Sequence, residues 1–104
     1  MGITLSGGEP FTQAEALTVL SKRARAMGLN IFCYTGYTFE QLYEQFPEHP
    51  EYKELLEQCD WLVDGRFVEE EMSLMLHFRG SRNQRILDVP ESLKQGKAVL
   101  SDIN

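Results

Sequence analysis

Three short apolar segments alternate with two segments of helical periodicity, and this alternation constrains the fold more than any other feature of the 104 residues. The apolar segments span residues 2–5, 30–34 and 60–64. An order of strand, helix, strand, helix, strand is typical of right-handed βαβ units on a parallel sheet. We therefore predict a single α/β domain over residues 1–104, with parallel strands and flanking helices.

Capping and breaking residues set the limits of the expected helices. A capping box pairs a threonine at the N-cap with a glutamate or glutamine three residues later. The first helix carries apolar residues at steps of three and four, namely Ala14, Leu17, Leu20, Ala24 and Met27. The expected helices are 12–27, with the box Thr12 and Glu15 and a stop at Gly28, then 38–46, with the box Thr38 and Gln41, and 50–58, beginning at Pro50.

The part of the chain after residue 66 is patterned more loosely. The elements expected there are a short helical start at 69–71, a strand at 86–89, a short helix at 90–94 and an edge strand at 98–100. Arg79, Arg82 and Arg85 concentrate positive charge within seven residues. This charge suits an anionic ligand or an acidic partner, and it equally suits a surface loop whose arginines pair with nearby glutamates.

Each apolar segment ends in a turn of small or polar residues, and these turns span residues 6–9, 35–36 and 64–66. In parallel sheets the carboxyl ends of the strands share one edge, and ligands bind there. The two adjacent glycines of the first turn allow close approach to the backbone, and the glutamate after them adds a fixed negative charge. A Gly-Gly pair is also common in a plain tight turn, so the residues alone leave both interpretations open.

Charge and composition exclude several classes of protein. The net charge of −6 argues against non-specific nucleic-acid binding, which needs clustered lysine and arginine. No apolar run is long enough to cross a bilayer, and residues 1–5 do not resemble a secretory signal, so we expect a cytoplasmic protein. Cys33 and Cys59 have no cysteine or histidine close by, which predicts two free, buried thiols and no metal site.

Four longer motifs follow one another along the chain, and they are Ser6-Gly7-Gly8-Glu9-Pro10, Tyr34-Thr35-Gly36-Tyr37-Thr38-Phe39-Glu40, Asp64-Gly65-Arg66-Phe67 and Phe78-Arg79-Gly80-Ser81-Arg82-Asn83-Gln84-Arg85-Ile86. In this order they resemble the radical SAM activating enzymes of glycyl radical enzymes. The resemblance runs from residue 2 to about residue 100, and it is closest to the subfamily that acts on anaerobic ribonucleoside-triphosphate reductase. It implies a partial (β/α) barrel of the radical SAM type that lacks the first strand and the cluster loop.

The resemblance also implies a chemistry. Enzymes of this family use S-adenosylmethionine and a [4Fe-4S] cluster to generate a glycyl radical on a partner, here anaerobic ribonucleotide reductase, and the cofactors carry the reaction. An ammonium group favours backbone carbonyls and a carboxylate. The cofactor-binding positions that match the family are Gly7, Gly8 and Glu9 for the amino group of the methionine moiety, Thr35 and Gly36 beside the cofactor, Asp64 and Arg66 for the ribose and the methionine carboxylate, and Asn83 in a Gly-x-x-Asn turn.

The iron-sulfur cluster is the point at which this chain departs from the family. The family's ligands come from a Cys-x-x-x-Cys-x-x-Cys loop ahead of the Gly-Gly-Glu turn, and Cys33 and Cys59 do not replace that loop. We therefore expect no catalytic or metal-binding residue and no activity of this chain alone, and the resemblance leaves open whether it is an enzyme. The alternatives are a non-catalytic docking module for a glycyl radical enzyme and a small α/β domain that binds another ammonium-bearing ligand or nucleoside. An exposed first strand at residues 2–5 predicts self-association.

Overall fold

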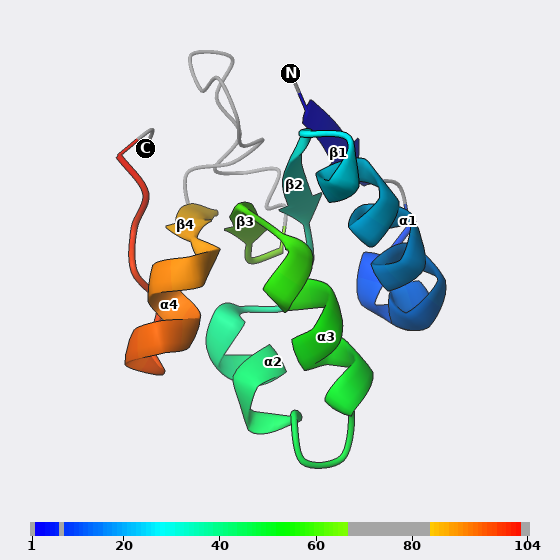
Figure 1. The fold of residues 1–104 in the computed structure, drawn as a ribbon. Coiled ribbons are helices and arrows are strands. Elements are labelled where there is room, and N and C mark those ends of the chain that lie inside the picture. Colours follow the sequence, from blue (N-terminus) through cyan, green and yellow to red (C-terminus); the bar gives the residue numbers. More distant parts are fainter. Residues whose placement is uncertain (1, 7, 67–83, 103–104) are drawn as a thin grey trace.

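The computed structural model describes residues 2–6, 8–66 and 84–102, and these form an α/β fold around a four-stranded sheet (Figure 1). The strands, in their order across the sheet, are β1 (Gly2–Leu5), β2 (Asn30–Tyr34), β3 (Trp61–Asp64) and β4 (Arg85–Asp88). β1, β2 and β3 are parallel, as the alternation of the sequence predicts. Their carboxyl ends therefore share one edge of the sheet.

β4 runs antiparallel to β3, so the expectation of an entirely parallel sheet is wrong for this strand. A parallel neighbour needs a crossover of a dozen or more residues, usually a helix, and the sequence between β3 and β4 carries no long amphipathic pattern. The sheet of the described residues is open and mixed. Leu100 forms a single antiparallel bridge with Leu87, where an edge strand over 98–100 was expected.

The helical segments of the described residues are η1 (Pro10–Gln13), which is a turn of 3₁₀ helix, α1 (Ala14–Ala26), α2 (Phe39–Glu44), α3 (Pro50–Gln58) and α4 (Val89–Gln95). α1 and α4 lie at the two ends of a row, with α2 and α3 between them (Figure 1). α3 matches its prediction, and α2 is shorter than the expected 38–46. None of these helices is long and apolar enough to cross a membrane.

The start of α1 differs from its prediction. The chain enters the helix through η1, whose N-cap is Glu9, and the Glu9 carboxylate accepts a hydrogen bond from the Phe11 amide at 3.1 Å. The Thr12 hydroxyl donates to the Glu9 carbonyl at 2.7 Å. The Thr12 capping box is therefore wrong, because Pro10 fixes a helical φ and begins the helical turn two residues earlier.

The face of α1 that packs on the core keeps part of the expected apolar stripe, including the partly buried Leu17, and adds small and polar residues. Ala14 and Ala24 are buried as predicted, whereas Leu20 and Met27 are 49% and 75% exposed. The other buried positions are Thr18 and Ser21. α1 packs against α3, and small side chains on the facing side let the two helices approach closely.

The capping box at the start of α2 is confirmed in both of its hydrogen bonds. The Gln41 amide donates to the Thr38 hydroxyl at 3.1 Å, and the Thr38 amide donates to the Gln41 side-chain oxygen at 2.9 Å. The box fixes where α2 begins, and so it fixes the turn between β2 and α2.

The core lies between the sheet and the helices. Ile31 and Cys33 of β2 and Leu62 of β3 are fully buried there, together with Leu55 and Leu56 of α3. Burial of this kind is the main term that stabilises a small domain.

The other face of the sheet carries the alternate residues of the strands. Phe32 lies there with its ring centroid 5.6 Å from that of Tyr34 and 5.5 Å from that of Trp61. At the edge of the sheet, Gly2 and Thr4 of β1 are exposed, although the apolar run predicts a strand buried on both faces.

Candidate functional site

The turns after β1 and β2 meet through the carboxylate of Glu9. Its Oε1 accepts from the Gly36 amide at 2.8 Å, and both of its oxygens lie 2.9 Å from the Thr35 hydroxyl. Its Oε2 also accepts from the Phe11 amide at 3.1 Å. Glu9, Thr35 and Gly36, which the sequence places at neighbouring strand ends, are therefore in direct contact.

Glycine is needed beside this carboxylate for two different reasons. Gly8 adopts a φ of +25°, which side chains other than hydrogen rarely allow. A Cβ at Gly36 would lie 3.6 Å from Glu9 Oε1, so any larger side chain there would begin to cover the carboxylate. The half-buried Glu9 carboxylate consequently has a residue without a side chain, Gly36, next to its Oε1.

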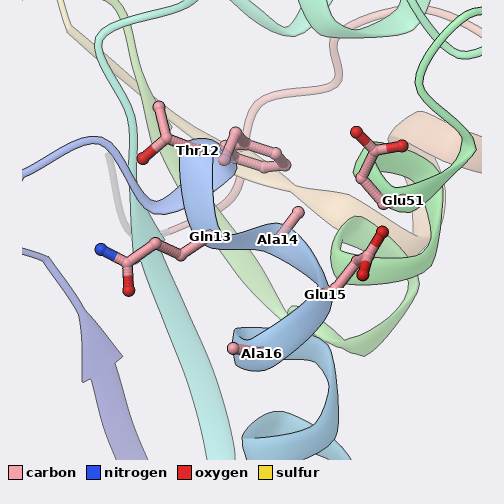
Figure 2. A pocket seen from close by; sticks show the side chains of 7 residues that line it. Thr12, Gln13, Ala14, Glu15, Ala16 and Glu51 are labelled. Atoms are coloured by element: carbon pink, nitrogen blue, oxygen red, sulfur yellow. The ribbon is translucent and has the colours of Figure 1, made fainter.

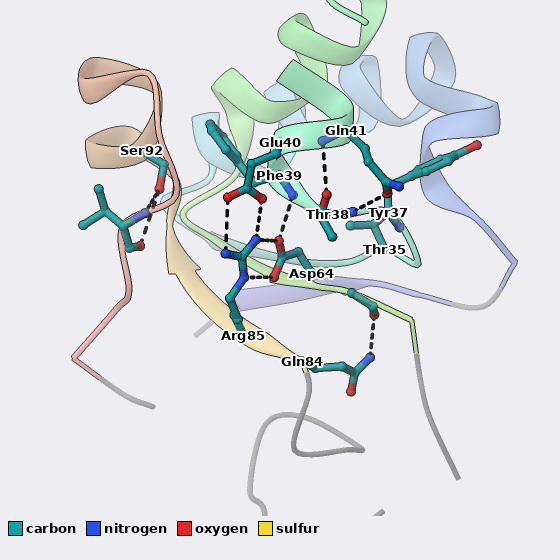
Figure 3. Close-up of polar contacts among 12 residues, drawn as sticks. Thr35, Tyr37, Thr38, Phe39, Glu40, Gln41, Asp64, Gln84, Arg85 and Ser92 are labelled. Carbon is teal, nitrogen blue, oxygen red and sulfur yellow. Dashed lines mark hydrogen bonds and ion pairs between the residues drawn. The ribbon is translucent and has the colours of Figure 1, made fainter. Parts of the chain in front are cut away.

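Asp64, at the end of β3, has a different environment. Its side chain is fully buried, and its Oδ2 accepts from the Phe39 amide at 2.7 Å, at the start of α2. Arg85 of β4 donates through Nε to Oδ1 at 3.0 Å and through Nη2 to Oδ2. Figure 3 shows the guanidinium between Asp64 and α2. Both oxygens of Asp64 are thus engaged by groups of the protein.

Arg85 also pairs with Glu40 of α2. Its Nη2 donates to Glu40 Oε1 at 2.7 Å, and the Glu40 side chain is 57% exposed. Hydrogen bonds to Asp64 and then to Glu40 raise the pKa of Arg85, and the hydrogen bond from Arg85 lowers the pKa of Glu40. Arg85 is therefore a permanent cation held by two carboxylates.

A chain of hydrogen bonds joins the end of β3 to Glu9. The Gly65 amide donates to the Tyr37 carbonyl at 2.8 Å, and the Tyr37 amide donates to the Thr35 hydroxyl at 3.1 Å. The Thr35 hydroxyl then donates its own proton to Glu9. Gly65 has a φ of +97°, which fits glycine at this position.

The remaining predicted residues are placed as follows. Arg66 is exposed at the end of the turn after β3. Gly7 and Asn83, and with them Arg79 and Arg82, lie outside the described residues. Of the three arginines only Arg85 is described, and its pairing with Glu40 agrees with the interpretation of arginines paired to glutamates.

The pair of Asp64 and Arg85 is the feature that sequence reasoning missed. The two residues are directly opposite in the antiparallel register of β3 and β4. An acidic residue at one strand end and a basic residue at the start of another were both visible in the sequence. Their pairing depends on the strand direction, which the pattern of apolar residues does not show.

The two cysteines are free and buried, as predicted. A hydrogen bond to Cys59, together with burial, raises the pKa of the Cys33 thiol. The Cys59 thiol donates to the Leu55 carbonyl at 3.3 Å. A thiol of raised pKa in an apolar core is a poor metal ligand, and the described residues contain no cluster of three or more potential metal ligands.

A cavity of about 190 Å³ lies on a different part of the surface, between the start of α1 and α3. Its lining consists of residues 11–16 and Glu51, and Figure 2 shows the Glu15 and Glu51 carboxylates beside it. Of the predicted cofactor-binding residues that the structure describes, none lines it.

Comparison with known proteins matches the chain to one sequence family and to relatives that share one name. The sequence model of the family described as "4Fe-4S single cluster domain" matches residues 1–87. The chain is 36% identical over 89 residues to the anaerobic ribonucleoside-triphosphate reductase-activating protein of Vibrio cholerae, covering 82% of this chain and 54% of the relative.

Two further relatives carry the same name. The protein of Haemophilus influenzae is 34% identical over 89 residues, with 82% of this chain and 54% of the relative covered. That of Escherichia coli K12 is 32% identical over 87 residues, with 80% and 53% covered. The chain thus spans about half the length of these relatives. No solved structure matches the chain significantly.

Proposed function

This chain belongs to the 4Fe-4S single cluster domain family, and on that premise we propose that it is part of an activating enzyme for an anaerobic ribonucleotide reductase, which is a glycyl radical enzyme. Its relatives are activating proteins for anaerobic ribonucleoside-triphosphate reductase. The three parallel strands with helices along them support a partial (β/α) barrel of the radical SAM type as the fold. The free thiols agree with a reducing, cytoplasmic location.

The observation that carries this proposal is the position of Glu9. Its half-buried carboxylate lies at the carboxyl ends of β1 and β2, next to Gly36, which has no side chain to cover it. A ligand ammonium in that place gains a charge-assisted hydrogen bond. We propose that Glu9 binds the amino group of S-adenosylmethionine and that Gly8 and Gly36 admit the methionine moiety.

Thr35 and Gly36 serve this site by orienting the carboxylate. A hydroxyl has one proton, so Thr35 donates to one oxygen of Glu9 at a time, while the Gly36 amide holds Oε1. The Phe11 amide donates to Oε2, which leaves one lone pair of the carboxylate for a bound ammonium. Arg66, which is exposed at the end of the next strand, carries the charge that suits the methionine carboxylate. Gly7, in the motif for the amino group, and Asn83, in the Gly-x-x-Asn turn, belong to the same proposal, and both lie outside the described residues.

The residues of this chain do not fit a [4Fe-4S] cluster. Such a cluster needs three thiolates from one loop in this family. The chain has two cysteines, both buried in the core on different elements, and the pKa of Cys33 is raised. We propose that the chain alone is inactive, since S-adenosylmethionine needs the cluster for reductive cleavage.

Calorimetric titration of the purified chain with S-adenosylmethionine tests the proposal. Glu9→Gln is expected to weaken binding by about 1.5 to 3 kcal/mol, which is the value of a hydrogen bond to a charged group. Glu57→Gln, at an exposed glutamate of α3, is the control and is expected to bind as the unmodified chain does. Equal affinities of Glu9→Gln and the control exclude Glu9 from the site.

A second candidate function is a non-catalytic docking module for a glycyl radical enzyme. The two buried cysteines favour it, because they leave the chain without cluster ligands of its own. Titration with S-adenosylmethionine separates the two functions, since a docking module binds the reductase without binding S-adenosylmethionine.

A further inference from the structure

We propose that Asp64 and Arg85 are positioning residues, which hold the turn from Thr35 to Thr38 against Glu9 without contacting the ligand. The expected role of Asp64 was a contact with the ribose. Its carboxylate, however, is fully buried and points to α2, where it meets the Phe39 amide (Figure 3). The inference rests on the proposed function only for its consequence on ligand binding.

The first step is the fixation of α2. A fully buried carboxylate is stable only when it is paired and hydrogen-bonded. Asp64 meets this condition with the planar fork of Arg85 on one side and the Phe39 amide on the other. Because Phe39 is the first residue of α2, the ion pair ties the start of this helix to the end of β3.

The second step is the cation itself. Arg85 contacts Asp64 of β3 and Glu40 of α2 while it belongs to β4. One guanidinium therefore connects three elements around the start of α2. A lysine has no such fork and makes a single point contact.

The third step leads from the end of β3 to Glu9. The Gly65 amide holds the Tyr37 carbonyl at 2.8 Å, and the Tyr37 amide occupies a lone pair of the Thr35 hydroxyl at 3.1 Å. That hydroxyl must then direct its proton elsewhere, and Glu9 is its acceptor. The turn from Thr35 to Thr38 is thus held by Gly65 on one side and by Glu9 on the other. Its position orients the Glu9 carboxylate.

Hydrogen exchange of backbone amides, measured by NMR on the full chain, tests this inference. In Arg85→Gln, the amides of Gly36, Tyr37 and Phe39 are expected to exchange about tenfold faster or more relative to the amides of α3, because the turn opens locally. The matched control is Arg25→Gln, which breaks another arginine–aspartate pair, that of Arg25 with Asp60 at 3.2 Å. In the control the three turn amides are expected to exchange as in the unmodified chain.

A merely structural role predicts a different result. If Arg85→Gln accelerates all amides equally, the pair contributes to global stability alone and the inference is wrong. Unchanged exchange of the turn amides overturns it as well. Arg85→Lys, which keeps the charge, is expected to show intermediate acceleration, and it answers the same question if Arg85→Gln does not fold.

Ligand binding separates this inference from the proposed function. When titrated with S-adenosylmethionine, Arg85→Gln is expected to bind more weakly than Arg25→Gln. No binding to the unmodified chain contradicts the proposed function, and the exchange data still decide whether the pair positions the turn. Binding that is equal in the two variants, despite a loosened turn, shows that Asp64 and Arg85 do not act on the site.

Discussion

Glu40 is the one member of the ion-pair cluster that is largely exposed, and its titration reports on the cluster. The hydrogen bond from Arg85 lowers the pKa of Glu40 below its ordinary value of 4.5. A lowered pKa in the folded state means that the pair stabilises the fold above about pH 4.5 and loses this effect as the pH falls through the lowered value. The contribution is small, because the side chain is 57% exposed and solvent screens the pair.

The free energy of unfolding of the unmodified chain is expected to fall between about pH 6 and pH 3. We predict that it falls less in Glu40→Gln, which has no carboxylate to titrate at this position. The measurement is urea unfolding of the variant and the unmodified chain across that range. Parallel pH profiles for the two proteins would contradict the role given to the pair of Glu40 and Arg85.

The sequence predicts one half of the candidate site better than the other. Glu9, Thr35 and Gly36 were expected together because parallel strands end at a common edge, and they are in contact. Asp64 was placed at the same edge, yet its side chain lies on the helix side of the sheet, with Arg85. Which face a strand-end residue takes depends on the register of β3, and a four-residue apolar strand does not show its register.

Of the two predicted threonine caps, only the one at α2 forms in the structure. This difference predicts different stability losses when each threonine is replaced. Thr38 makes both bonds of its capping box, whereas Thr12 lies inside η1 and donates a single bond to the Glu9 carbonyl. We predict that Thr38→Ala lowers the free energy of unfolding by about 1 kcal/mol. The matched change Thr12→Ala, at an exposed site, is expected to stay within about 0.5 kcal/mol.

Chemical denaturation of both variants checks this prediction. A Thr12→Ala loss as large as that of Thr38→Ala would mean that Thr12 caps α1 after all. The sequence could not separate the two cases, because the same spacing occurs twice. Pro10 decides between them, since it starts the helical turn ahead of Thr12.

α1 shows why periodicity alone misplaces a buried face. Leu20 of α1 and the C-cap residue Met27 follow a helical stripe but are exposed, whereas Thr18 and Ser21 are buried. Close packing of two helices selects small residues, and hydrophobicity scales give these little weight. The existence and length of α1 were therefore predictable, and its orientation was not.

At the scale of the molecule, the parallel half of the sheet follows from the sequence and the antiparallel strand does not. α1 connects β1 to β2, and α2 and α3 connect β2 to β3, as βαβ units require. β4 reaches the sheet without such a signal, and its direction follows from the antiparallel register that pairs Trp61 with Asp88 at one end and Asp64 with Arg85 at the other.

The other edge of the sheet carries the last prediction. β1 pairs with β2 along one side, and no described residue pairs with its other side. Its residues, Gly2 to Leu5, include no charge and no proline, which are the usual protection of an edge strand. We predict that the chain self-associates at tens of micromolar and that Thr4→Lys, a change at an exposed residue of β1, shifts it toward monomer.

Sedimentation velocity over a range of concentrations measures this association. Val19→Lys is the matched control, because Val19 is a 55% exposed apolar residue on α1, on the side next to α3. Since backbone groups of the edge drive the pairing, the control is expected to associate as the unmodified chain does. A monodisperse monomer at these concentrations contradicts the prediction, and loss of association in Val19→Lys alone would move the contact from the strand to the helix.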